Sequence, residues 1–113
     1  MSKPQSSARN LIDGQWSAQG EAFSVTDKFS GESIGQGWAA TAAQVDAAVA
    51  AARRSFVEHP LDPNARYTIL MKVAELLGEN REDLAASIIG ESGIPWKDAF
   101  NEVGRAMETF RVS

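Results

Sequence analysis

Apolar residues in the middle of the chain recur at helical spacing, in two runs separated by a short break. These positions are Ile69, Leu70, Val73, Leu76 and Leu77 in the first run, and Leu84, Ala85, Ile88 and Ile89 in the second. Residues three and four apart share one face of a helix, so the pattern predicts two consecutive amphipathic helices. We expect the rest of the chain to pack around this pair.

The residues that flank both runs are typical of helix ends. Asp62 suits an N-cap, and Pro63 fits the first helical position, where a missing N–H costs nothing. Asn80 is expected to cap the second helix. Gly93 suits the left-handed conformation in which many helices end.

A further helix is predicted before this pair. Thr41 and Gln44 form a capping box, in which each side chain satisfies the other residue's backbone N–H. The Ala-rich segment behind them should end near Val57, because His59 precedes Pro60 and the residue before proline avoids helical space. The expected apolar stripe of this helix is Val45, Ala48, Val49, Ala52 and Phe56.

The last predicted helix has Pro95 in its first turn and reaches about Arg111. Its apolar stripe is Trp96, Phe100, Val103, Met107 and Phe110. Two interpretations of this stripe stay open. It is either core or an interface within the same chain, or it is a surface that binds a partner.

The first part of the chain predicts short strands. Asp13-Gly14 favours a type I′ turn, with Leu11-Ile12 and Gln15-Trp16 as the arms of a hairpin. A half-buried strand is predicted from the alternation of Phe23, Val25, Asp27 and Phe29, and a returning strand from Glu32 to Trp38. We expect residues 1–10, which are polar, to form a disordered lead-in to this antiparallel β unit.

Composition restricts the function classes. Apolar residues make up 43% of the chain and charged residues 23%, which is typical of a soluble globular protein of one domain. The net charge of −4 argues against nucleic-acid binding, since phosphates select basic surfaces. The chain has no cysteine, which excludes disulfides and a cysteine nucleophile within it. Without a signal-peptide core or a membrane-length apolar run, we expect a cytoplasmic protein.

One glycine motif is a candidate cofactor-binding site. Gly35 to Ala40 fits G-x-G-x-x-A, and Glu58 follows at the distance of a ribose-binding acid. In a dinucleotide-binding turn, however, the helix starts inside the glycine loop and meets the pyrophosphate. Here the capping box places the helix start at Thr41, after the motif. The alternative interpretation is a flexible strand end.

The other candidates for chemistry are isolated. His59 is the single histidine and is either a general base or a surface residue at a helix end. Neighbouring acidic residues, which suit metal ligands or a solvated helix face, are Asp98 with Glu102, Glu75 with Glu79, and Glu82 with Asp83. From pattern alone, the sequence predicts a soluble β-plus-helix domain without a visible active site.

Several short motifs occur in a fixed order along the chain. They are Ile12-Asp13-Gly14-Gln15-Trp16, the strand–turn–strand from Phe23 to Gly35, the helical segments from Val45 to Phe56 and from Arg66 to Leu77, Asn80 to Ala85, Glu91 to Pro95, and Glu102-Val103. This order and spacing resemble the N-terminal segment of the aldehyde dehydrogenase superfamily. The resemblance covers nearly all of residues 11–113, and its specificity comes from the combination of motifs.

One segment and one single residue depart from the family pattern. Asp27 to Glu32 replaces the usual N-P-x-T-G-E, and this variant is similar to members that act on small or acidic aldehydes such as lactaldehyde, phosphonoacetaldehyde or sulfoacetaldehyde. Ile94 replaces the common lysine of G-K-P, to which no catalytic role attaches.

The resemblance implies an α/β aldehyde dehydrogenase fold. In it, residues 11–113 are the N-terminal part of the cofactor-binding domain, truncated at Ser113: an antiparallel β-hairpin unit followed by about four amphipathic helices. The implied activity is the NAD- or NADP-dependent oxidation of an aldehyde to a carboxylic acid through a cysteine thioester. The catalytic and cofactor-contacting residues of the family belong to later segments, so none is assigned here, and we expect the chain alone to be inactive.

The resemblance also implies partners. Some members bind a structural monovalent cation through backbone oxygens at positions that match Val25, Thr26 and Glu102. The full-length protein is expected to bind a small aldehyde and to form a homo-oligomer, a dimer or tetramer, without nucleic-acid or membrane partners. Two alternatives remain: a stand-alone interaction domain that binds a partner through the Trp96–Phe110 face, and a small cofactor-binding module at Gly35–Ala40.

Overall fold

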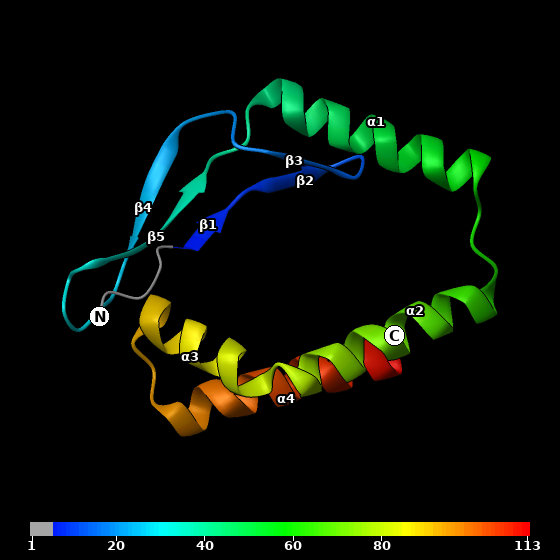
Figure 1. Cartoon of the computed structure of the whole chain (residues 1–113). Helices are drawn as coiled ribbons and strands as arrows, with labels where there is room; N and C mark the ends of the chain where they lie inside the picture. The colour runs from blue at the N-terminus through cyan, green and yellow to red at the C-terminus, as the bar shows by residue number, and fades with distance from the viewer. Residues whose placement is uncertain (1–5) are drawn as a thin grey trace. The chain divides into compact units, whose positions relative to one another are not determined.

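The computed structural model describes residues 6–113, and Figure 1 shows the order of their strands and helices. These residues fall into two compact units. Residues 6–26 and Ser30–Pro60 form the first, which we call the strand unit because it holds all the strands of the described residues and one helix. Asp27–Phe29 and Leu61–Ser113 form the second, which contains three helices and which we call the helical unit.

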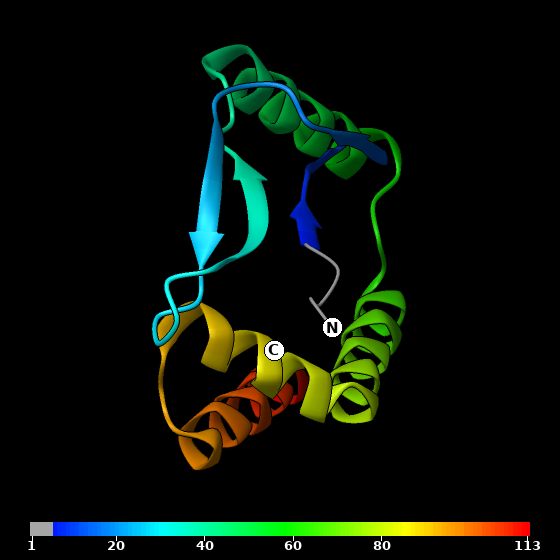
Figure 2. The same cartoon turned by 60° about the vertical axis from the view of Figure 1, so that its left-hand side comes forward.

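Three strands of the strand unit form one sheet, in the order β1-β5-β4. β4 (Ala22–Thr26) and β5 (Ser33–Trp38) are antiparallel, as predicted, and lie side by side in Figure 2. β1 (Ser6–Ala8) pairs in parallel with β5. The expectation of disorder over residues 1–10 is therefore wrong for β1, whose backbone pairs along one edge with a strand that is distant in sequence. Residues 1–5 lie outside the described residues.

β4 ends earlier than the alternation of its apolar residues predicts. The carboxylate oxygen Oδ1 of Asp27 accepts a hydrogen bond from the backbone N–H of Phe29 at 2.9 Å. A short polar side chain that bonds the backbone two residues on stabilises a turn instead of a strand. The predicted buried face therefore stops at Val25, and the Phe29 side chain is fully exposed.

The predicted hairpin is confirmed. β2 (Asn10–Ile12) and β3 (Gln15–Ser17) are antiparallel, with Leu11 opposite Trp16. The turn residues Asp13 and Gly14 have φ angles of 50° and 75°. A type I′ turn requires positive φ at both central positions, and Asp and Gly tolerate it best.

α1 (Ala42–Glu58) starts with the predicted capping box. The backbone N–H of Thr41 donates to Oε1 of Gln44 at 2.9 Å, and the N–H of Gln44 donates to Oγ1 of Thr41 at 3.2 Å. Gln44 also donates through Nε2 to Oγ of Ser17 at 3.0 Å. The buried amide is thus satisfied, and it ties the start of α1 to the end of β3.

The apolar stripe predicted for α1 is not the face that the rest of the strand unit covers. α1 runs along β2 in Figures 1 and 2, and its buried residues are Gln44 and Ala51. Val45, Val49 and Phe56 are 51%, 63% and 76% exposed. Within the strand unit, the covered face therefore shares only Ala48 with the predicted apolar stripe, because the hairpin approaches the helix where side chains are short or can bond to it.

The three helices of the helical unit are α2 (Pro63–Glu79), α3 (Arg81–Ser92) and α4 (Trp96–Val112). Asp62 caps α2 as predicted, since its Oδ1 accepts from the N–H of Ala65 at 2.9 Å. Gly93 ends α3 in the left-handed region with a φ of 74°. Asn80 does not cap α3. Its amide donates to the carbonyl of Leu76 at 2.8 Å and so satisfies the last turn of α2 instead.

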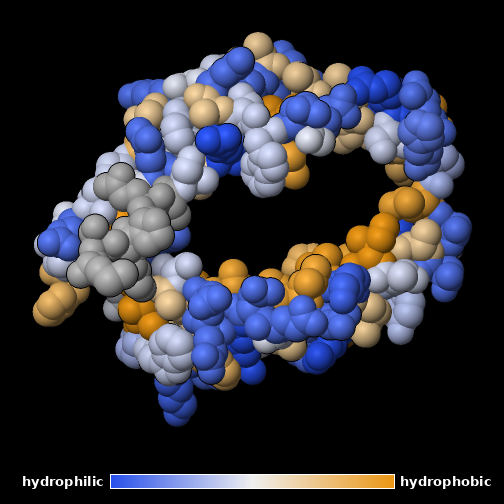
Figure 3. All heavy atoms as spheres, viewed as in Figure 1, coloured by the Kyte–Doolittle hydropathy of each residue, from blue (hydrophilic) through white to orange (hydrophobic). Residues whose placement is uncertain are grey.

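The core of the helical unit is small. α4 packs against α2 and α3, and the buried cluster consists of Ala85, Ala99 and Val103. Partly buried residues around this cluster are Leu84, Ile88, Ile89, Ile94 and Phe100. No large side chain is completely buried among the described residues. Figure 3 shows hydrophobic side chains gathered along the surface of the helical unit, and Leu61, Tyr67 and Ile69 of this unit are about half exposed.

Candidate functional site

The glycine motif lies inside a strand. Gly35 and Gly37 belong to β5, and α1 begins only after Thr41. A Cβ atom at Gly37 would lie 2.5 Å from Cζ of Phe23, its partner on β4, so this glycine makes room for an aromatic ring. Strand N–H groups do not converge on a phosphate as those of a helix N-terminus do. The motif therefore does not fit a nicotinamide dinucleotide, and the cofactor-module interpretation of Gly35–Ala40 loses its structural basis.

His59 occupies the C-cap of α1. Its backbone N–H donates to the carbonyl of Ser55 at 2.9 Å, which closes the last turn of the helix. The residue itself is exposed. The structure therefore gives His59 a helix-end role, with Pro60 stopping the helix behind it.

Two of the candidate acidic residues, Glu75 and Glu102, form surface ion pairs. Nζ of Lys72 donates to Oε2 of Glu75 at 2.7 Å, and this hydrogen bond raises the pKa of Lys72 above its ordinary value. Glu102 pairs with Arg105 at 2.8 Å. Such exposed pairs contribute little to stability. Over residues 6–113, no three His, Asp or Glu side chains come together in a way that would hold a metal ion.

The backbone cation site stays a prediction from the family resemblance. Val25 and Thr26 lie at the end of β4, where the pairing with β5 shifts register. Glu102 lies in the middle of α4, in the helical unit.

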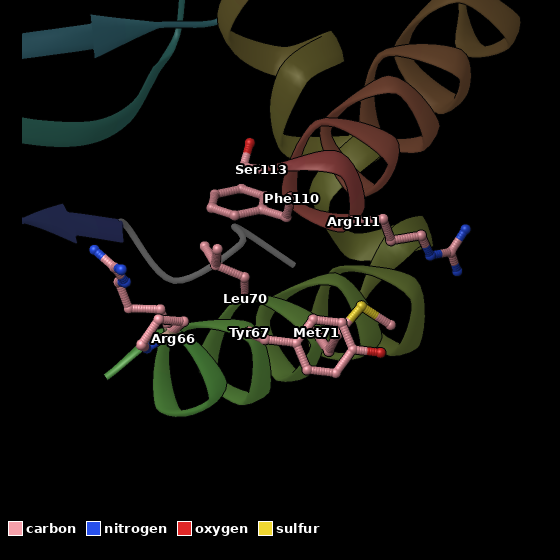
Figure 4. A pocket seen from close by; sticks show the side chains of 8 residues that line it. Arg66, Tyr67, Leu70, Met71, Phe110, Arg111 and Ser113 are labelled. Carbon is pink, nitrogen blue, oxygen red and sulfur yellow. The ribbon is translucent and has the colours of Figure 1, made fainter. Parts of the chain in front are cut away.

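A pocket of about 300 Å³ opens in the helical unit between α2 and the end of α4 (Figure 4). Its lining residues are Pro63, Arg66, Tyr67, Leu70, Met71, Phe110, Arg111 and Ser113. Arg111 pairs with Glu108, and Oγ of Ser113 donates to the carbonyl of Thr109. None of the lining side chains carries a carboxylate, an imidazole or a thiol, so the lining offers no nucleophile with an adjacent side-chain base. The pocket is an apolar hollow without catalytic groups.

One polar contact between two helices of the helical unit was not predicted from the sequence. The guanidinium of Arg81, at the start of α3, donates through Nη2 and Nε to the carbonyl of Phe100 at 2.9 and 3.1 Å. It also lies 3.7 Å from the centroid of the Phe100 ring. A cation at a helix N-terminus opposes the helix dipole, which was the one available signal that Arg81 has another partner.

The Trp96–Phe110 stripe packs largely inside the helical unit. Val103 is only 3% exposed, and Phe100 packs against the buried cluster. Trp96 is 49% exposed and stacks on Phe100, with ring centroids 6.0 Å apart. Intrachain packing is therefore confirmed for the centre of the stripe, and the interaction-domain alternative loses most of its surface.

Comparison with known proteins supplies what the site geometry does not. A profile of the aldehyde dehydrogenase family matches residues 16–113, which is most of the chain. The chain belongs to the aldehyde dehydrogenase family. The resemblance read from the ordered motifs is thereby confirmed. Among residues 6–113, none of the helices is both long and apolar enough to cross a membrane.

Curated relatives match over a limited part of their length. The N-succinylglutamate 5-semialdehyde dehydrogenase of Erwinia tasmaniensis is 41% identical over 106 residues, which are 92% of this chain and 22% of the relative. The protein of the same name from Burkholderia lata is 43% identical over 95 residues, 82% of this chain and 20% of the relative. The chain thus spans about a fifth of the length of these relatives.

Solved structures agree with the predicted fold class. An NAD-dependent aldehyde dehydrogenase from Sinorhizobium meliloti is 30% identical with a TM-score of 0.87, covering 96% of this chain and 23% of that protein. The NADP-dependent glyceraldehyde-3-phosphate dehydrogenase from Bacillus halodurans is 30% identical with a TM-score of 0.86, covering 95% and 23%. Strands followed by helices, as part of the aldehyde dehydrogenase fold, are therefore confirmed.

Proposed function

We propose that this chain acts as part of an NAD(P)-dependent aldehyde dehydrogenase, an oxidoreductase that converts an aldehyde into a carboxylic acid. The observation that carries the proposal is the family match over residues 16–113, which contains most of the ordered motifs of the sequence. Relatives that share 38–43% identity with the chain over most of its length bear dehydrogenase names.

In this proposal the chain is scaffold and not catalyst. It contains no cysteine, so it cannot supply the thiolate nucleophile that the resemblance implies. Its glycine motif is occupied by strand pairing and by the Phe23 ring, so it does not hold the cofactor's phosphates. Residues 11–113 serve as the N-terminal part of the cofactor-binding domain. The nicotinamide cofactor, NAD or NADP, binds to segments outside this chain.

The substrate proposal follows the relatives. The curated relatives named above are N-succinylglutamate 5-semialdehyde dehydrogenases, so this acylated, carboxylate-bearing semialdehyde is the first substrate to test. The small acidic aldehydes indicated by the Asp27–Glu32 variant, lactaldehyde, phosphonoacetaldehyde and sulfoacetaldehyde, form the second group. The proposed full-length enzyme is a cytoplasmic homo-oligomer, a dimer or tetramer.

A fusion protein tests the function. This chain replaces the matching 106-residue segment of the Erwinia tasmaniensis relative, and the product is hereafter called the fusion. We expect the fusion to reduce NAD or NADP in the presence of an aldehyde, and the isolated 113-residue chain to show no such activity. A soluble, folded fusion without activity, beside an active parent enzyme, would contradict the proposed function.

A further inference from the structure

α1 carries two different faces, of which only one is covered in the strand unit. The covered face is the line of Gln44, Ala48 and Ala51, which lies along the β2–β3 hairpin. The second face carries the larger side chains, in the order Val45, Val49, Ala52 and Phe56. Its exposed fractions reach 63% at Val49 and 76% at Phe56. We call these four residues the α1 stripe.

The α1 stripe has the spacing of a helix-packing seam. Its residues follow each other at intervals of four, three and four, which keeps them on one side of the helix over nearly its whole length. Valine and phenylalanine have a lower helix propensity than alanine, so helix formation alone does not explain their presence in this Ala-rich segment. An apolar stripe of this regularity on a surface marks a docking face.

We propose that the α1 stripe is the surface on which the remaining part of the aldehyde dehydrogenase polypeptide docks. The inference rests on the proposed function. The rest of the enzyme is the expected partner because the chain matches only 22% of its Erwinia relative. About four fifths of such an enzyme are therefore available to cover the α1 stripe. The strand unit lacks a core of its own large side chains, since its buried residues in α1 are Gln44 and Ala51. Cover from outside therefore supplies the hydrophobic contacts that this unit does not make internally.

A second copy of the chain is the competing occupant. Asp46 and Arg53 flank the α1 stripe on one side, and neither forms an ion pair within the described part of the chain. In an antiparallel pair of α1 helices, Asp46 of one copy would lie near Arg53 of the other, as in the flanking positions of a coiled coil. The experiment must therefore separate self-association from docking.

Two alanines of α1 provide a matched pair of substitutions. Ala52 belongs to the α1 stripe, whereas Ala50 is exposed and lies about 160° away around the helix axis. Ala52→Asp and Ala50→Asp therefore make the same chemical change, with the same loss of helix propensity, on two sides of one helix. If the stripe is covered, only Ala52→Asp places a charge without a partner in an apolar interface.

The decisive measurement compares the unfolding temperatures of the fusion and its two variants. We expect Ala52→Asp to lower that temperature by about 5 °C or more relative to Ala50→Asp. Equal unfolding temperatures would overturn the docking inference while an active fusion still supports the proposed function. An inactive fusion that shows the Ala52-specific loss would refute the function and support the docking. An insoluble fusion beside a soluble parent would count against docking.

Light scattering on the isolated chain tests whether a second copy of the chain binds to the α1 stripe. We expect no defined dimer that depends on the α1 stripe. A dimer that Ala52→Asp converts into monomers, and that Ala50→Asp leaves intact, would assign the stripe to a second copy and overturn the inference.

Discussion

Gly104 on α4 leaves open the space that the guanidinium of Arg81 occupies. A Cβ atom at Gly104 would lie 2.7 Å from Nη2 of Arg81, and it would stand in the path to the carbonyl of Phe100, four residues earlier on the helix. We predict that Gly104→Ala destabilises the chain, although alanine is the better helix former. The substitution should force the guanidinium off both the Phe100 carbonyl and the Phe100 ring.

The magnitude follows from three contributions. A hydrogen bond from a charged donor contributes about 1.5–3 kcal/mol. A cation over an aromatic ring adds about 0.5–1 kcal/mol at a partly exposed site. Alanine in place of glycine inside a helix stabilises by about 1 kcal/mol. Loss of most of the Arg81 contact therefore outweighs the gain in propensity, and Gly104→Ala should cost about 1 kcal/mol of unfolding free energy.

The sign of the effect should reverse once Arg81 is removed. In an Arg81→Ala background, Gly104→Ala has no guanidinium to displace and should stabilise by about 0.5–1 kcal/mol. The assay is urea unfolding followed by far-ultraviolet circular dichroism, for the parent chain, the two single variants and the double variant, from which a coupling energy of about 2 kcal/mol is expected.

Gly78→Ala is the control for this cycle. A Cβ atom at Gly78 would meet only the flexible end of Met107, at 3.0 Å from its Cε, and not Arg81. We expect this substitution to have the same effect with and without Arg81. If Gly104→Ala raised stability equally in both backgrounds, the assigned contact between Arg81 and α4 would be refuted.

Further predictions concern the ends of the helices. Asp62→Ala should lower the unfolding free energy by about 1 kcal/mol, because it removes the acceptor for the N–H of Ala65. Asn80→Ala should lower it by less, since the Asn80 side chain caps no N–H of α3. Urea unfolding compares the two variants, and a larger loss at Asn80 would contradict the assigned caps. Gly93→Ala should cost about 1 kcal/mol, because its φ of 74° disfavours a side chain and the new Cβ would lie 3.1 Å from Cβ of Lys28. Thermal unfolding measures this loss, and an unchanged midpoint would speak against the left-handed C-terminus of α3.

Features fixed by neighbouring residues were predictable from the sequence. The Thr41–Gln44 capping box, the Asp62 cap and the Asp13-Gly14 turn each depend on residues no more than three positions apart. Such contacts form within one turn of chain, so residue type and spacing specify them. The sequence also excluded a thiolate nucleophile within the chain, because the chain has no cysteine.

Competition between local partners was harder to predict. Asn80 stands between two helices, and its amide bonds the carbonyl end of α2 instead of the N–H groups of α3. The alternation of residues predicts Asp27 as part of a strand. Its carboxylate instead accepts a hydrogen bond from the N–H of Phe29, which stabilises a turn. In both cases the residue has two local uses of similar energy, and the pattern of apolar residues does not choose between them.

The sequence by itself determined the family, the order of the strands and helices after β1, and most of their ends. Only the tertiary structure decided which surfaces meet. The spacing of apolar residues predicted the α1 stripe but not the element that packs against it. In the structure, the hairpin covers Gln44 and Ala51, while Val49 stays exposed. The pairing of β1 with β5 and the contact of Arg81 with Phe100 join residues 19 or more positions apart. Contacts of this kind depend on which strands and helices pack together. The spacing of residues along the chain does not specify those partners.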